Sequence, residues 1–84
     1  MSERIFLDAR ALEHPVPLER GIAALRELDD TNHFYMLHRK YPVPLVDMAQ
    51  AQGFAVRSVE RPEGVWHILI ARHKGIETEE LVDV

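Results

Sequence analysis

Two short stretches of the chain hold most of the side chains that could bind an anion or transfer a proton. The first contains Arg10 and His14, and the second is the run His38-Arg39-Lys40. Each stretch leads into the same tetrapeptide, Pro-Val-Pro-Leu, at residues 15–18 and 42–45. Arginine and lysine bind anions through charge-assisted hydrogen bonds, and histidine titrates near neutral pH. The residue types therefore indicate anion binding, with histidine acid–base chemistry and metal ligation as alternatives.

The pattern of apolar residues places each of these stretches between a strand and a helix. Residues 4–8 and 33–38 are short apolar runs that end in polar residues, which is typical of strands. A helix is predicted over residues 17–28, where apolar residues recur every three or four positions, and a second over about 44–52. Proline suits the first turn of a helix, where its missing N–H leaves no hydrogen bond unmade.

Two further strands are predicted at residues 54–60 and 65–72, joined by a compact Pro- and Gly-containing turn. The element order is then β-α-β-α-β-β, an α/β two-layer sandwich. Right-handed crossovers between parallel strands place both helices on one face. The strand at 33–38 is apolar on both faces, so we expect it to be central. We treat residues 1–73 as one domain and residues 74–84 as an acidic, flexible tail.

This arrangement brings the two stretches to one edge of the sheet. Ligands of open α/β sheets favour the carboxyl ends of the strands, and helix N-termini there attract anions. The predicted binding residues are those of the two loops: Arg10, His14, Pro15, Pro17, His38, Arg39 and Lys40. The competing interpretation is that these charges are solvated and paired locally, Arg10 with Asp8 or Glu13.

Composition argues against several other classes of protein. The net charge is −4, so a general nucleic-acid binder is not expected. The absence of cysteine excludes disulfides and thiolate chemistry. No apolar run reaches membrane-spanning length, and the start of the chain lacks the apolar core of a signal peptide, so we expect a cytoplasmic protein. His14 and His38 lack an evident third ligand, so neither a metal nor another cofactor is expected.

The segment Leu7–Leu18 resembles the opening motif of the TusA/SirA-like sulfur carriers, in which a Leu-Asp start precedes a Cys-Pro-x-Pro signature. The chain is more similar still to a related, uncharacterised bacterial family of unknown function. That family shows an Asp-x-Arg-x-Leu-x-x-Pro-x-Pro-Leu opening, matched by Asp8–Leu18, and a His-Arg-x-x-Pro-x-Pro-Leu segment, matched by His38–Leu45. Gly53-Phe54 and Trp66–Ile70 follow the same pattern, so the resemblance covers about residues 5–72.

The resemblance implies a TusA-like fold, with a four-stranded mixed sheet of order 1-2-4-3 and two helices on one face. The persulfide cysteine of the carriers corresponds to His14, and because imidazole cannot hold a persulfide, sulfur-carrier activity is not expected. The preferred hypothesis is a non-enzymatic module that binds a small anionic ligand or an unidentified protein partner at the Pro-x-Pro loops. The alternatives are a small enzyme that uses His14 as acid or base, and a metal- or haem-binding protein that uses His14 and His38.

Overall fold

The computed structural model of the chain describes residues 3–72. Its six elements are β1 (Glu3–Asp8), α1 (Val16–Glu27), β2 (Asn32–His38), α2 (Val43–Ala51), β3 (Ala55–Glu60) and β4 (Trp66–Ala71). This is the predicted order, and both helices begin one residue earlier than the sequence pattern indicated. The acidic tail predicted at residues 74–84 lies outside the described residues.

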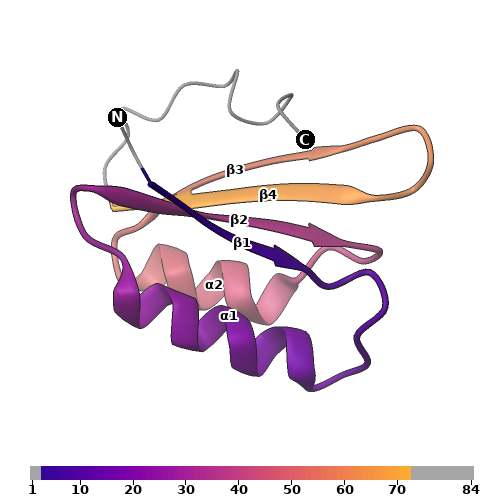
Figure 1. Cartoon of the computed structure of the whole chain (residues 1–84), viewed down its shortest axis with the longest axis horizontal. Helices are drawn as coiled ribbons and strands as arrows, with labels where there is room; N and C mark the ends of the chain where they lie inside the picture. Colours follow the sequence, from indigo (N-terminus) through magenta and orange to yellow (C-terminus); the bar gives the residue numbers. More distant parts are fainter. Residues whose placement is uncertain (1–2, 73–84) are drawn as a thin grey trace.

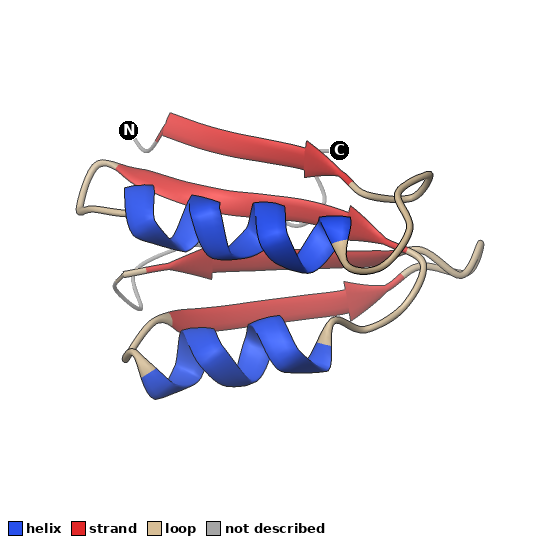
Figure 2. Cartoon of the chain, turned by 90° about the horizontal axis from the view of Figure 1, so that it is seen from below, coloured by secondary structure: helices blue, strands red, loops and turns tan. Residues whose placement is uncertain are grey.

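The four strands form one mixed sheet of order β1-β2-β4-β3. The β1–β2 pair is parallel, and β4 runs antiparallel to both β2 and β3. Both helices cover the same face of this sheet, as Figures 1 and 2 show. The strand order implied by the family resemblance is therefore confirmed, as is the central place of β2. Neither described helix is long and apolar enough to cross a membrane.

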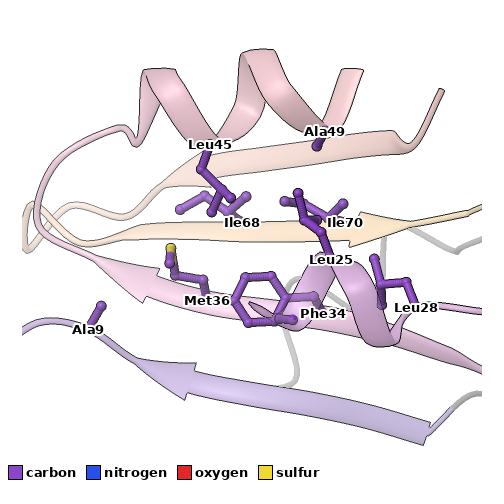
Figure 3. Packing of buried hydrophobic residues seen from close by; sticks show 10 residues of the cluster. Ala9, Leu25, Leu28, Phe34, Met36, Leu45, Ala49, Ile68 and Ile70 are labelled. Atoms are coloured by element: carbon purple, nitrogen blue, oxygen red, sulfur yellow. The ribbon is translucent and has the colours of Figure 1, made fainter. Parts of the chain in front are cut away.

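The main core lies between the sheet and the two helices (Figure 3). Alternate residues of the two central strands point into it because side chains of a strand alternate between faces. The labelled core residues are Ala9 after β1, Phe34 and Met36 of β2, Ile68 and Ile70 of β4, Leu25 and Leu28 of α1, and Leu45 and Ala49 of α2. The apolar stripe predicted along α1 thus faces the sheet.

The two helices come close together where Gly21 of α1 meets Leu45 of α2. A Cβ atom added at Gly21 would lie 2.5 Å from Cδ2 of Leu45 and 2.9 Å from its Cδ1. Because real carbon atoms do not approach so closely, any larger residue at this position would force Leu45 to move. Leu45 is fully buried. Gly21 therefore sets the packing between the second turn of α1 and the first turn of α2.

Gly53 lies directly after Gln52, the residue that caps the C-terminus of α2. Its φ is +87°, a backbone conformation that glycine adopts at little cost. The N–H of the next residue, Phe54, donates a hydrogen bond of 3.0 Å to the carbonyl of Ala49. The chain then turns directly into β3.

Candidate functional site

The parallel pairing of β1 and β2 decides where the site lies. Asp8 at the end of β1 is level with Leu37 near the end of β2, so both strands end at the same edge of the sheet. The N–H of Ala9 donates a hydrogen bond of 2.8 Å to the carbonyl of Leu37, which joins the first loop to β2. Figure 2 shows both loops leaving this edge, where α1 and α2 also begin. The predicted meeting of the two loops is therefore present in the structure.

A cavity of about 660 Å³ lies between the two loops and the first turns of the helices. Its polar lining consists of Arg10, Glu13, His14, His38, Arg39 and Lys40. Its apolar lining consists of Leu12, Pro17, Leu18, Pro42, Pro44 and Leu45, together with Ala9 and the ring of Tyr41. We call this space the loop cavity. It is large enough for a small organic ligand.

The structure brings together six of the seven residues predicted for the site. Pro15 is the exception, because it is exposed and lies just before α1, where its carbonyl accepts a 3.0 Å hydrogen bond from the N–H of Glu19. Of the apolar lining, only Pro17 was among the predicted site residues. Leu18 belongs to the apolar stripe predicted along α1, and it packs against the core as well as lining the cavity. Leu12 also does both, and an apolar residue within a charged loop is a signal by which it could be found.

Arg10 is paired with Asp8, as the competing interpretation predicted. Its Nε and Nη2 atoms donate hydrogen bonds of 2.8 and 2.7 Å to the two carboxylate oxygens, and its backbone N–H donates to Oδ1 at 3.1 Å. These hydrogen bonds from Arg10 lower the pKa of Asp8 to about 2. The pair orients the guanidinium and offsets its charge. Among residues 3–72, neither Arg39 nor Lys40 has an ion-pair partner, so these two exposed side chains are the uncompensated cations of the loop cavity.

The two histidines of the loop cavity differ in how they are held. The N–H of Lys40 donates a 3.0 Å hydrogen bond to Nδ1 of His38, so the neutral ring carries its proton on Nε2. Burial, and then the nearby charge of Lys40, lower the pKa of His38, which keeps the ring neutral at pH 7. His14 is exposed, and no hydrogen bond orients its ring within the described part of the chain. Nowhere in that part do three or more potential metal ligands come together.

Comparison with known proteins identifies the class of fold. The chain is similar to a SirA-like protein from Desulfitobacterium hafniense whose crystal structure is known, with a TM-score of 0.66 and 26% sequence identity. The match covers 79% of this chain and 95% of that one. The protein therefore has the SirA-like fold.

Residues 6–72 match the model of a family described as "Uncharacterized conserved protein (DUF2249)". The chain belongs to this family, which confirms the resemblance seen in its sequence motifs. It contains no cysteine at the position of His14 or elsewhere. None of the curated proteins compared with the chain matches it.

Proposed function

We propose that this protein is a non-enzymatic binding module whose loop cavity holds an anionic group carried on an apolar body. The anion belongs either to a small molecule or to the acidic segment of a protein partner. The observation that carries the proposal is that cationic side chains and a set of apolar side chains, which we call the apolar floor, line the same cavity. Ligand pockets commonly combine a mostly apolar lining with a few polar groups that fix the orientation of the ligand.

The charges around the cavity favour a ligand with a single negative charge. Arg10 and Asp8 offset each other, Glu13 adds one negative charge, and Arg39 and Lys40 add two positive charges. The net charge of the cavity lining is therefore one positive charge. The Nε2–H of neutral His38 provides a further hydrogen-bond donor. A carboxylate fits this balance better than a phosphate dianion does.

The apolar floor favours a ligand with a hydrocarbon part. Leu12, Leu18, Pro42 and Pro44 line the cavity and are partly or fully exposed, so an inorganic anion would leave these surfaces in contact with water. Each methylene group that moves from water into such a site contributes about 0.8 kcal/mol. Binding of an alkyl carboxylate therefore uses both halves of the cavity.

The surroundings of His14 support binding rather than catalysis. A general base is usually held by a third group that fixes its ring and its tautomer. His14 is exposed, and no side chain of residues 3–72 holds it by a hydrogen bond. His38 is oriented, but its pKa is lowered by burial and by Lys40, and its hydrogen bond leaves Nε2 as a donor.

The first test is a calorimetric titration of the full chain with acetate, butanoate, octanoate and inorganic phosphate. We expect affinity to rise with chain length, by about 0.8 kcal/mol for each methylene that the cavity buries. Acetate binding as tightly as octanoate would contradict the role of the apolar floor. Phosphate binding more tightly than octanoate would contradict the charge argument. Displacement of octanoate by a peptide of acidic and apolar residues would assign the anion to a protein partner.

The second test places the ligand at the loop cavity. The variant R39Q/K40Q removes its two uncompensated cations, while R20Q/R26Q removes two exposed charges of α1 that do not line it. We expect the first variant to lose about 1–2 kcal/mol of octanoate binding, which is roughly a 5- to 30-fold rise in Kd, and the control to keep its affinity. Equal losses in the two variants would show that octanoate responds only to net charge.

A further inference from the structure

The face of the sheet opposite the helices carries a cluster of buried apolar residues, Tyr35, Leu37 and Leu69. The strand register places Phe6, Tyr35, Leu69 and Arg57 in one row across this face. Both helices lie on the other side of the sheet (Figure 1). Even so, Tyr35 is 0% exposed and Leu69 is 1% exposed. The open face of a two-layer sandwich normally carries polar residues, because it meets water.

Cationic side chains surround this apolar row. The guanidinium of Arg4 lies 4.5 Å from the centre of the Tyr35 ring, and Arg57 is exposed at the β3 end of the row. Arg61 and Glu63 lie in the turn between β3 and β4, and both charges, together with that of Arg10, affect the pKa of His67 on the same face. A segment that covers this face must therefore combine apolar side chains with negative charges.

We propose that the C-terminal segment of this same chain, residues 76–84, docks on this open sheet face. The segment has the required composition: its apolar residues are Ile76, Leu81, Val82 and Val84, and its carboxylates are Glu77, Glu79, Glu80 and Asp83. It contains no basic residue. Its carboxylates lie against the arginines at the edges of the face, and its apolar side chains lie over the central row.

The length of the chain after β4 allows this docking. Residues 73–84 can span roughly 40 Å when extended, whereas the longest dimension of the molecule is 29 Å. The segment leaves from the end of β4, which is antiparallel to β2, so a reversal of direction carries it back across the sheet. Gly75 provides the backbone freedom for that reversal.

A second copy of the chain is a poorer occupant of the face. Pairing two such faces would bring their arginine edges together, and like charges facing each other across an interface oppose association. The tail instead brings opposite charge, and its covalent attachment gives it an effective concentration in the millimolar range. We therefore expect the contact to be intramolecular.

The experiment uses a spin label at V84C in the full chain, where it is the only cysteine. Relaxation enhancement of the backbone amides is measured by NMR, with the reduced label as reference. Because the effect falls with the sixth power of distance, docking predicts several-fold stronger broadening at Tyr35 and Leu69 than in α1 and α2. Broadening that is uniform, or strongest at the loop cavity, would overturn the proposal.

A mixed sample separates the intramolecular contact from one between two copies. It combines a spin-labelled chain that is invisible to NMR with an unlabelled, isotope-enriched chain. We expect no broadening of the sheet amides in this mixture. Broadening equal to that within the labelled chain would overturn the intramolecular contact in favour of a second copy.

Matched charge variants test the role of the carboxylates. E77Q/E79Q/E80Q neutralises three carboxylates of the tail, and E19Q/E27Q/D47N neutralises three exposed carboxylates of α1 and α2. In the V84C background we expect the first set to reduce the broadening of the sheet amides several-fold and the second to leave it unchanged. Equal effects of the two sets would overturn the charge complementarity on which the docking is argued.

Discussion

The contact between Gly21 and Leu45 predicts that G21A destabilises the protein when leucine is present at position 45. The same substitution should stabilise the protein once L45A has removed that leucine side chain. Replacing Gly21 by alanine gains about 0.8–1 kcal/mol of helix propensity. The new Cβ, however, would lie 2.5 and 2.9 Å from the two Cδ atoms of Leu45. Overpacking of this kind costs about 1–3 kcal/mol. The net result for G21A is a loss of about 0–2 kcal/mol in the free energy of unfolding.

The neighbouring substitution L45A removes the atoms that the new Cβ would meet. Because Leu45 is fully buried, L45A alone should cost about 2–5 kcal/mol. In that background G21A no longer causes overlap and fills part of the cavity, so it should stabilise the protein by about 1 kcal/mol. The coupling free energy between the two sites is then about 1–3 kcal/mol, favourable to the double variant.

Urea denaturation of the full chain measures all four proteins of this cycle. Trp66 is the only tryptophan, and its ring centre lies 5.0 Å from that of Tyr41, so its fluorescence should report loss of tertiary packing. The control A23G, at an exposed position of the same helix, measures the propensity difference without the overlap. If G21A stabilised the protein equally in both backgrounds, the reasoning about close approach would be refuted.

Three further predictions follow from the hydrogen bonds and titrating groups. Y35F removes the 2.8 Å hydrogen bond between the hydroxyl of Tyr35 and Nδ1 of His67. It should lower the free energy of unfolding, measured by urea denaturation, by about 1–3 kcal/mol and leave the affinity for octanoate unchanged. Burial lowers the pKa of His67 and of His38 in the folded protein. As the pH drops below 6.5, these histidines take up protons in the unfolded chain before they do so in the folded one, so the free energy of unfolding should fall. Equal urea midpoints at pH 5.5 and pH 7.5 would contradict this. The pKa of Asp8 is lowered to about 2, so its contribution to stability is complete above about pH 4 and lost between pH 4 and 2. D8N should abolish the loss of stability between pH 4 and 2. Because it also frees the charge of Arg10, it should tighten octanoate binding, and weaker binding would count against the charge balance of the loop cavity.

The order and type of the elements could be predicted because the apolar patterns are local. The stripe along α1 and the apolar run of β2 each appear within one continuous segment, and the structure confirms both. The order of the strands could not be derived in this way, because pairing depends on contacts between distant segments. It came instead from the family resemblance.

The cationic side of the loop cavity could be predicted, whereas most of its apolar floor could not. Parallel pairing of the first two strands is enough to bring Arg10 and Arg39 to one edge of the sheet. Which side chains of the loops turn inward depends on the path of the backbone, which a pattern of residues does not encode. Leu12 and Leu18 therefore emerged as cavity residues only in the structure, and Pro15 moved out of the lining.

The most direct test of the proposed function is an NMR titration of the full chain with octanoate, following the backbone amides. We expect saturable shifts that cluster at residues 10–18 and 38–45, where the two loops and the first turns of α1 and α2 line the cavity. In R39Q/K40Q the shifts should need a roughly 5- to 30-fold higher octanoate concentration to saturate, and in R20Q/R26Q they should saturate as in the original chain. Shifts that are absent, unsaturable or centred on the open sheet face would contradict the assignment of the loop cavity as the binding site.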